Sequence, residues 1–505
     1  MALAQRRGNN VCGKENVMVW QGNYDKLFIG GKWVDPESAE TFAVISPSTE
    51  EVIARVPQGT TADVDKAVAA ARAAFDQGPW PRMPLDERIA VLRKLSAKLE
   101  EKQDVAAELV SAEMGCPITL STKMQSIGPR LLLDSFIELA PQYNWSDIRR
   151  SATGNALVTR EPVGVVAAVV PWNAPLLITM IKLAPALLAG CTMIIKPTPQ
   201  TPLDAYFLAD LLAEVGLPDG VVNVVPADRD VSEYLVRHRG VDKVSFTGST
   251  AAGRRIGAIC GEDLRRCTLE LGGKSAAVLL DDADLDLAIP SIRALSLRNT
   301  GQVCSNKTRI VVAASRRDEL LDRLVDMIGS MPVGDPFDPA TEIGPVASAV
   351  QRDRVEDYVG DAKAAGLKLL VGGGRPAGLD RGFYVEPTIF ADVDPNAKIA
   401  QEEVFGPVLT VHTFGDENEA IDIANNSEYG LNGSVFTADP EHALAFARNI
   451  RTGTVELNGS GVGFHAPIGG FKHSGIGREA GLEGFDAYVE LKSYGLPADL
   501  LAKLS

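Results

Sequence analysis

Apolar residues follow two different periods along the chain. In residues 61–77 and 85–114 they recur every three or four positions, which is typical of amphipathic surface helices. From Val163 onward, short continuous apolar runs alternate with longer periodic segments. Continuous runs of this length are typical of strands buried on both faces. This part of the chain therefore predicts parallel sheets that are covered by helices.

The strand-and-helix pattern forms two blocks. The first block predicts strands at 163–170, 192–197, 221–226 and 241–246, and helices at 176–189, 202–215, 231–239 and 251–261. The second block predicts strands at 275–280, 308–313, 410–414 and 433–437, and helices at 285–298, 317–328, 417–425 and 440–451. We therefore expect an α/β fold with two Rossmann-like parallel-sheet domains and a cleft between them.

The blocks suggest where the domains begin and end. Residues 1–142 and 162–272 are assigned to the first domain, and residues 273–472 to the second. Residues 143–161 and 486–505 fit neither block and are expected to form a small bridging β element. A strand near 487–494 could extend the sheet of a neighbouring subunit, so a homodimer or homotetramer is expected. Residues 1–25 are interpreted as a loose N-terminal extension.

Charge and cysteine usage narrow the functional classes. The 505 residues include 50 basic and 66 acidic side chains, a formal charge of −16, which disfavours nucleic acid and anionic membrane surfaces as partners. Apolar stretches are shorter than the roughly 20 residues of a membrane helix, so we expect a soluble protein. The six cysteines form no CxxC pair. Their even number would allow disulfides, but reduced thiols in the cytoplasm fit a long chain without secretory features better.

Metal chemistry has little support in the sequence. The five histidines are dispersed, no His/Cys ligand spacing is present, and we expect these residues on the surface: His238, His412, His442, His465 and His473.

Two residues carry candidate chemistry. Cys304, in NTGQVCSN (299–306), follows a predicted helix in a polar turn. A lone cysteine is more often an inert core residue, but backbone N–H groups in such a turn can stabilise a thiolate. Glu270, in ELGGKS (270–275), ends an apolar strand before two glycines. A strand-end glutamate is usually solvated, yet at a domain junction it could be a partly buried base with a raised pKa.

Together these motifs resemble the aldehyde dehydrogenase superfamily, from about Leu27 to the C-terminus. The matching stretches, in order, are PWNAP (171–175), KPTPQTP (196–202), FTGSTAAG (246–253), ELGGKS (270–275), GQVCSN (301–306), EEVFGPV (402–408), NNSEYGL (425–431) and PIGGFKHSGIGRE (467–479). Each stretch alone is modest evidence, but eight in this order and spacing leave little room for coincidence.

The resemblance implies a catalytic role for several residues. The Cys304 thiolate would attack the aldehyde carbonyl, and the Asn173 amide together with the Cys304 backbone N–H would stabilise the oxyanion. Hydride transfer to the nicotinamide would leave a thioester, and Glu270 would activate the water that hydrolyses it. Lys182 and Glu479 match a proton path or structural pair behind this base.

The resemblance also implies an NAD(P) site. Lys196 would reach the adenosine ribose, and the turn Gly248–Ser249 would place a helix N-terminus near the pyrophosphate. Glu403 would hold the nicotinamide ribose, and Phe405 would pack beside the nicotinamide. The other implied cofactor contacts are Pro171, Trp172 and Leu271. Taken singly, each of these residues also has an ordinary structural interpretation.

Two departures from the family pattern bear on specificity. Many NAD-preferring relatives carry a glutamate where this chain has Pro199, so a 2′-phosphate is repelled less here; NAD is expected and NADP is allowed. Ala174 stands where relatives often have an aromatic residue. The candidate walls of the substrate pocket are Ala174, Leu177, Ile181, Val303 and Phe464. They predict an apolar tunnel for a small-molecule aldehyde of medium or bulky size, whether aliphatic, cyclic or aromatic.

Alternative functions differ in the fate of the thioester. A CoA-acylating semialdehyde dehydrogenase would pass the acyl group to CoA, but such enzymes generally lack the base that Glu270 supplies. An inactive structural or binding relative would lack Cys304 or Glu270, and both are present. Esterase activity of the same cysteine is interpreted as a side reaction.

The stretches GIGREA (475–480) and GSTAAG (248–253) mimic nucleotide-binding motifs, but the first has no clear strand before it and the second lacks the phosphate-binding lysine.

Overall fold

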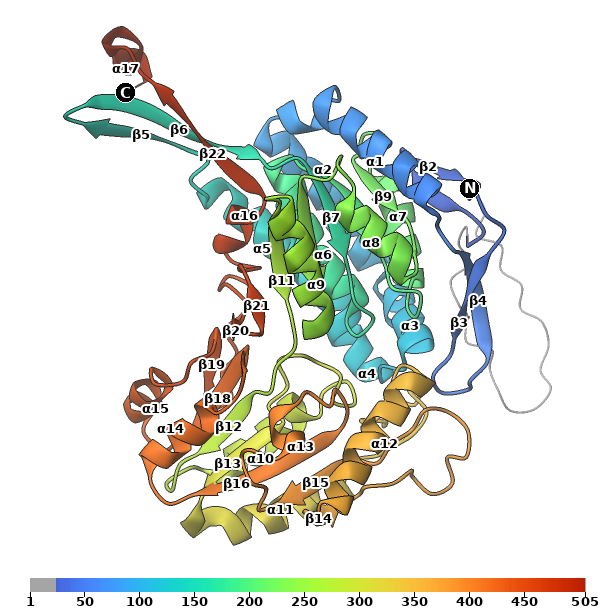
Figure 1. The fold of residues 1–505 in the computed structure, drawn as a ribbon, viewed down its shortest axis with the longest axis vertical. Helices are drawn as coiled ribbons and strands as arrows, with labels where there is room; N and C mark the ends of the chain where they lie inside the picture. Colours follow the sequence, from blue (N-terminus) through green and yellow to red (C-terminus); the bar gives the residue numbers. More distant parts are fainter. Residues whose placement is uncertain (1–23, 505) are drawn as a thin grey trace.

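A computed structural model describes residues 24–504. The predicted N-terminal extension therefore lies outside the described residues except for its last two positions, and so does Cys12. The described chain contains two large, mostly parallel sheets, a three-stranded antiparallel sheet and two two-stranded sheets (Figure 1). The fold is thus mixed α/β with two parallel-sheet units, as the sequence predicts.

The first sheet has eight strands in the order β2-β1-β9-β8-β7-β10-β11-β21. These are β2 (Lys32–Val34), β1 (Leu27–Ile29), β9 (Val222–Val224), β8 (Thr192–Lys196), β7 (Val165–Val169), β10 (Lys243–Thr247), β11 (Arg266–Glu270) and β21 (Gly475–Ile476). The strands from β9 to β11 are parallel. Their continuous apolar runs are explained by helices on both faces, which leave no side of the sheet in water.

Two apolar clusters cover the faces of the first sheet. One packs the sheet against α1 (Thr61–Asp76), α8 (Arg229–Arg237) and α9 (Thr250–Glu262). The other packs it against α2 (Leu85–Glu101), α3 (Gln103–Met114), α5 (Gly128–Leu139), α6 (Pro175–Ala189) and α7 (Leu203–Glu214). The short helix α4 (Ile118–Ser121) continues into a π-helical turn, η2 (Thr122–Ile127), before α5. A separate hairpin joins β3 (Thr41–Ile45) to β4 (Val52–Pro57).

The second sheet has seven strands in the order β14-β15-β16-β13-β12-β18-β19. These are β14 (Lys368–Val371), β15 (Thr388–Ala391), β16 (Val408–Phe414), β13 (Arg309–Ala313), β12 (Ala276–Leu279), β18 (Asn432–Phe436) and β19 (Thr454–Leu457). All pairs are parallel except β14 with β15. One face packs on α10 (Leu285–Ser296) and α11 (Arg317–Gly329), and the other on α14 (Glu417–Asn425) and α15 (Pro440–Ala447). A further cluster joins α12 (Ala349–Ala364) and α13 (Lys398–Gln401) to this unit.

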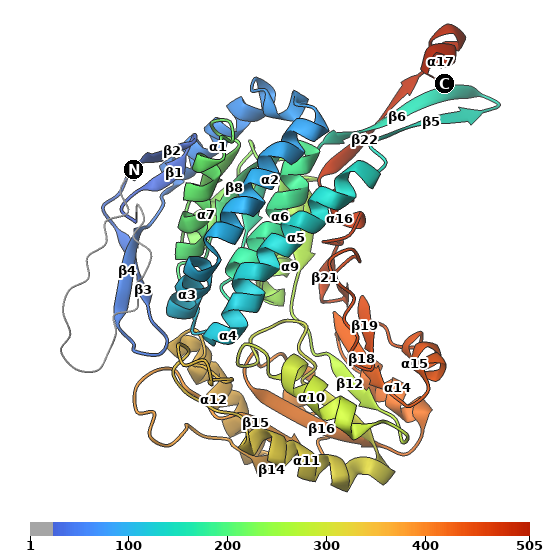
Figure 2. The same ribbon diagram turned by 180° about the vertical axis from the view of Figure 1, so that it is seen from behind.

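The C-terminal part of the chain links the two units. Strand β20 (Phe471–Lys472) pairs with β17 (Tyr429–Gly430), and β21 then joins the edge of the first sheet by pairing with β11. After α16 (Glu483–Asp486), strand β22 (Val489–Gly495) pairs with β6 (Gly154–Pro162), which also pairs with β5 (Ser146–Ser151). We call this three-stranded sheet, with α17 (Ala498–Leu504), the arm; it projects from the body of the molecule (Figures 1 and 2).

The structure corrects two expectations. The segment 85–114 is two helices, because Lys102 leaves the helical backbone conformation between α2 and α3. His412 is buried, not on the surface: it lies on the doubly covered strand β16, where its ring hydrogen-bonds the Thr410 hydroxyl and the Val393 carbonyl. None of the described helices is long and apolar enough to cross a membrane.

Candidate active site

A cavity of about 260 Å³ lies where the strands of the first sheet end and the second unit begins. Residues that follow parallel strands meet at one edge of a sheet, so the segments after β7, β10 and β11 converge here. The lining residues are Pro171, Trp172, Asn173, Ile178, Thr247, Gly248, Ser249, Leu271, Gly272, Cys304, Gln351, Arg354, Glu403 and Phe405. The structure thus gathers most of the predicted catalytic and cofactor residues, from distant stretches of sequence, around one space.

A tight turn presents Cys304 to this cavity. Asn299, Thr300 and Gly301 all have positive φ, so the chain reverses sharply after α10. A Cβ on Gly301 would overlap the Gly406 carbonyl oxygen, which leaves room only for glycine. The Asn299 amide and the Thr300 hydroxyl each donate to a backbone carbonyl. The turn is therefore held rigidly although its backbone is strained.

The environment of Cys304 does not favour a resting thiolate. Burial raises the pKa of this thiol to about 12, and the nearby carboxyls of Glu403 and Glu270 add to the increase. Arg298 and the Ser305 backbone N–H act in the opposite direction but more weakly. The sequence indicates that backbone N–H groups in such a turn can stabilise a thiolate. The Ser305 N–H acts in that direction, but the effect of burial is larger.

Asn173 is fixed from several sides. Its carbonyl oxygen accepts hydrogen bonds from Gln125 Nε2 (3.1 Å) and Asn299 Nδ2 (3.0 Å), and its own side-chain amide donates to the Gln302 carbonyl (2.9 Å). Asn173 and its three partners are buried. Because a primary amide has two N–H groups, one donor of Asn173 is left for a ligand in the cavity.

Glu270 ends strand β11 beside this cavity and is almost fully buried. Its pKa is raised well above the ordinary value, first by burial and then by the carboxylate of Glu479. Lys182 and Arg478 oppose this increase. One carboxylate oxygen, Oε1, has no hydrogen-bond partner. A Cβ on Gly469 would lie 2.9 Å from that oxygen, so a glycine here keeps space for the carboxyl.

Lys182 and Glu479 form a buried ion pair behind Glu270. Lys182 lies on α6 and Glu479 comes after β21, and their Nζ and Oε1 atoms are 2.6 Å apart. Both side chains are almost inaccessible to solvent. The two residues are 297 positions apart in the sequence, and the structure brings them together as the resemblance implies.

The predicted cofactor residues surround the other side of the cavity. Ser249 caps α9 by accepting a hydrogen bond from Ala252 N and also lines the cavity, so the N-terminus of α9 lies at the cavity. A Cβ on Gly248 would lie 2.5 Å from the Phe246 ring, so this turn requires glycine. The rings of Trp172 and Phe405 meet edge to face at 5.3 Å.

Helix α12 supplies two cavity residues that the sequence did not predict. Gln351 Nε2 donates to the carbonyls of Phe405 (2.7 Å) and Val404 (3.3 Å), and Arg354 donates to the Glu403 carbonyl (2.6 Å). Glu403 in turn accepts from Gly273 N (3.0 Å), and burial raises the pKa of its carboxyl to about 7. These contacts hold the loop that carries Glu403 and Phe405. Charged residues dominate α12 and obscure its apolar side (Val355, Tyr358, Val359 and Ala362), so the sequence pattern did not mark it as a helix that reaches the site.

Some predicted site residues lie outside the cavity wall. Lys196 is buried at the end of β8, where desolvation lowers its pKa to about 8. Among the predicted substrate-pocket residues, Ala174, Ile181 and Val303 are buried, whereas Leu177 and Phe464 are half-buried against the same apolar cluster as Ile181. Leu177 and Ile181 share one side of α6 by their spacing, and Ala174 directly precedes this helix. The cavity itself is lined by Ile178, the neighbour of Leu177.

Comparison with known proteins places this geometry in a family. The aldehyde dehydrogenase family model matches residues 33–494. Geranial dehydrogenase from Castellaniella defragrans is 45% identical over 472 residues, which cover 93% of this chain and 98% of that protein.

Solved structures agree with the sequence comparison. An aldehyde dehydrogenase of Mycobacterium tuberculosis complexed with NAD+ is 47% identical, with a TM-score of 0.93, over 94% of this chain and 98% of that one. A variant of aldehyde dehydrogenase C from Pseudomonas syringae, in complex with NAD+ and octanal, is 39% identical with a TM-score of 0.91 over 94% and 98% of the two chains. The chain therefore belongs to the aldehyde dehydrogenase family, whose members are NAD(P)-dependent enzymes.

Proposed function

We propose that this protein oxidises medium-sized or bulky apolar aldehydes to carboxylic acids with NAD+, using Cys304 as nucleophile and Glu270 as base. One observation carries the proposal: Cys304 and Asn173 line the same cavity as most of the predicted cofactor residues. Glu270 supports it, because its carboxyl is close enough to raise the pKa of the Cys304 thiol.

The residues around the cavity fit a dinucleotide. The N-terminus of α9 and the glycine turn before it suit a pyrophosphate, since backbone N–H groups there lack partners within the helix. The buried Thr247 hydroxyl has no partner and lines the same wall. Glu403 would hold ribose hydroxyls, and Trp172 and Phe405 would flank the nicotinamide. When bound there, NAD+ supplies the hydride acceptor and a positive charge that favours the Cys304 thiolate.

In the first half-reaction, Cys304 attacks the aldehyde carbon as the thiolate that the bound cofactor would favour. The free N–H of the Asn173 amide and the Cys304 backbone N–H stabilise the oxygen as it becomes negative. Removing one such donor typically costs about 10²–10³ in rate. Because Gln125 and Asn299 fix the Asn173 backbone, the donor is already in place before the charge develops. Transfer of the hydride from the thiohemiacetal carbon to the nicotinamide would leave a thioester on Cys304.

In the second half-reaction, Glu270 takes a proton from the water that attacks the thioester. A base needs a pKa near the working pH, and burial beside Glu479 raises the pKa of Glu270 in that direction. The C–S bond then breaks and releases the acid. A CoA-acylating enzyme would have no use for this buried carboxyl, so Glu270 favours hydrolysis.

The substrate proposal rests on the apolar residues beside the cavity. Ala174 is small, and Ile181 and Val303 carry no charge that would recognise a substrate carboxylate. The relatives named for geranial and complexed with octanal act on or bind apolar aldehydes, which supports the same class here.

The cofactor proposal favours NAD+ but does not exclude NADP+. Pro199 offers neither a hydroxyl acceptor for the adenosine ribose nor a negative charge against a 2′-phosphate. Lys196 precedes Pro199 in the sequence and is buried at the end of β8, and it is expected to reach the adenosine ribose from there. The NAD+ complexes of the solved relatives support NAD+ as the better substrate.

The partner proposal is a homodimer or homotetramer joined through the arm, whose residues 143–161 and 486–505 we assign to a bridging element. We keep the predicted division into a first domain (1–142 and 162–272) and a second domain (273–472), because each large sheet carries its own helices and apolar clusters.

A location in the cytoplasm stays a prediction.

The test is a spectrophotometric assay of NADH or NADPH formation with octanal, a cyclic terpenoid aldehyde, benzaldehyde and succinic semialdehyde. We expect turnover of the first three with NAD+, slower turnover with NADP+, and none in Cys304→Ala. A preference for succinic semialdehyde would contradict the substrate class. Turnover that requires added CoA would support the acylating alternative, and an inactive protein across the panel would contradict the proposed activity.

A further inference from the structure

Arg298 follows helix α10 and contacts the turn that carries Cys304 on both sides of the nucleophile. Its backbone carbonyl accepts hydrogen bonds from Gly301 N (3.1 Å) and from Asn306 Nδ2 (3.0 Å). Its guanidinium donates from Nη2 to the Ser305 hydroxyl at 3.0 Å. The main chain and the side chain of this one residue therefore hold the segment before Cys304 and the segment after it.

The Arg298 guanidinium is mostly buried and forms no ion pair with a carboxylate of the described residues. Its Nε atom is buried without a hydrogen-bond acceptor. Glu456 is the carboxylate that acts on Arg298, but its Oε1 lies 2.7 Å from Lys307 Nζ and 3.2 Å from Asn432 Nδ2. Because an unpaired charge inside a protein is costly, this guanidinium favours a negative group beside it.

The Cys304 thiolate is the negative group that fits this position. Of the charges that favour the charged form of Arg298, that of ionised Cys304 has the largest effect and Glu456 comes second. The effect is mutual. Burial, Glu403 and Glu270 raise the pKa of the Cys304 thiol, and Arg298 is the strongest of the groups that lower it. Opposite charges at close range stabilise each other.

We propose that Arg298 is a positioning residue that fixes the turn through its backbone and stabilises the Cys304 thiolate through its charge. The inference rests on the proposed function, in which this thiolate attacks the aldehyde carbon. A guanidinium stays protonated at every working pH. The turn therefore offers the thiolate a cation from within the chain before any cofactor is bound.

A purely structural role of Arg298 would depend on its size and hydrogen bonds, whereas the proposed role depends on its charge. Arg298→Met keeps a long side chain without the charge, and Arg298→Lys keeps the charge without the planar guanidinium. Glu456→Gln tests the sign, because it removes a negative charge that opposes the action of Arg298 on Cys304. The matched control is Arg293→Met, an arginine of α10 that pairs with Glu342.

The measurement is the rate at which iodoacetamide alkylates Cys304 in the cofactor-free protein, followed by peptide mass spectrometry across the neutral and mildly alkaline range. Only the thiolate reacts at an appreciable rate, so this rate reports the ionised fraction of Cys304. Cys304 is partly accessible to solvent, which allows the reagent to reach it.

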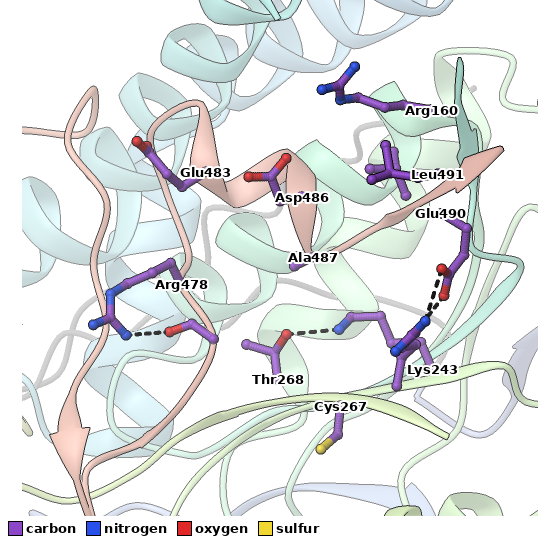
Figure 3. A pocket seen from close by; sticks show the side chains of 13 residues that line it. Arg160, Lys243, Cys267, Thr268, Arg478, Glu483, Asp486, Ala487, Glu490 and Leu491 are labelled. Atoms are coloured by element: carbon purple, nitrogen blue, oxygen red, sulfur yellow. Dashed lines mark hydrogen bonds and ion pairs between the residues drawn. The ribbon is translucent and has the colours of Figure 1, made fainter. Parts of the chain in front are cut away.

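Cys267 serves as an internal reference in the same samples. It is the other described cysteine that is not fully buried. Figure 3 shows its side chain on the side of β11 opposite to Thr268, near the start of the strand. The groups that act on its thiol are Cys260 and Lys243, so changes at Arg298 should leave its alkylation rate unchanged.

We expect alkylation of Cys304 to fall about tenfold in Arg298→Met, because a nearby opposite charge strongly favours ionisation. The rate should stay within about threefold of wild type in Arg298→Lys and rise about threefold in Glu456→Gln. Single-turnover hydride transfer to NAD+ should slow in parallel in Arg298→Met, without accumulation of acyl-enzyme, because hydrolysis does not need a new thiolate. Arg293→Met should match wild type.

Three results would overturn the proposal. One is equal alkylation of Cys304 in wild type and Arg298→Met. Another is an equal loss in Arg298→Met and Arg298→Lys, which would mean that only the shape and hydrogen bonds of arginine matter. The third is slower alkylation in Glu456→Gln. If melting temperatures show that Arg298→Met does not fold, Arg298→Lys and Glu456→Gln still decide.

Failure of the proposed function would look different. Wild-type protein would then form no NADH from any aldehyde, although alkylation of Cys304 would still follow the charge at position 298.

Discussion

Two buried carboxyls, those of Glu270 and Glu479, lie near one buried lysine, Lys182. Lys182 pairs directly with Glu479, while Glu270 retains an oxygen without a partner and a raised pKa. Burial and the neighbouring Glu479 carboxylate disfavour the charged form of Glu270, so the unpaired carboxyl is the one suited to take up a proton. The assignment of Glu270 as base thus depends on its neighbours and not on its position alone.

Replacing Glu270 by Gln tests this assignment. The amide keeps the size of the side chain but cannot take a proton from water, so we expect kcat to fall by about 10²–10⁴. The first turnover should survive, because attack by Cys304 and hydride transfer do not need the base. Stopped-flow absorbance should then show a burst of one NADH per active site and, after it, a slow phase.

The rate of thioester hydrolysis should depend on pH through the protonation of Glu270. Glu270 accepts a proton only when it is ionised, and its pKa is raised. Wild-type hydrolysis should therefore accelerate as the pH rises through this elevated pKa, and the slow phase of Glu270→Gln should lack that increase. A missing burst, or a slow phase with the wild-type pH profile, would contradict the role of Glu270.

At the scale of single elements, α12 shows how a helix outside the motifs shapes the site. Phe405 has a φ of 62°, a conformation that a bulky residue adopts only when its surroundings hold it. Gln351 accounts for this, since its amide donates to the carbonyls of Phe405 and Val404. The loop beside the expected nicotinamide position is therefore held at Phe405 by one buried glutamine, while Arg354 holds the neighbouring Glu403.

Gln351→Leu should weaken NAD+ binding. Leaving a buried carbonyl without its donor costs about 1–3 kcal/mol, so the loop should relax and the Kd for NAD+ should rise about tenfold. Quenching of tryptophan fluorescence measures this Kd, because Trp172 lines the cavity. Val350→Ala, an exposed neighbour on the same helix, is the matched control. Equal affinities for the three proteins would argue against this role of α12.

The elements that sequence reasoning found share one property, a continuous apolar run between turn residues. Strands β7 and β8 and helix α6 match the predictions to within a residue or two. Helix α5 was missed because it begins with Gly128–Pro129, and α12 because its charges hide an apolar side. Pairing of Lys182 with Glu479, and of β21 with β11, depends on tertiary contacts between distant segments, which local patterns do not encode.

At the scale of the whole molecule, the arm is the part that carries free strand edges and exposed apolar side chains away from the two large sheets. It consists of three antiparallel strands, and a small sheet in water needs a covered apolar face for stability. Its exposed apolar residues include Leu491 at 63% and Leu500 at 42%. Strands β5 and β22 are both sheet edges in the described chain, and β19 is an edge of the second sheet. Free edges and apolar side chains on a projecting element are typical of a subunit interface.

We therefore expect the double variant Leu491→Lys, Leu500→Glu to dissociate the oligomer. Charges at these positions would have to be buried when a second copy covers the arm, which costs several kcal/mol per unpaired charge. Light scattering coupled to size-exclusion chromatography should show a dimer or tetramer for wild type and a monomer for the variant. Val350→Lys, likewise at an exposed position but remote from the arm, should keep the wild-type mass. A monomeric wild type would refute the arm as an interface, whereas a variant that stays assembled would place the contact elsewhere on the molecule.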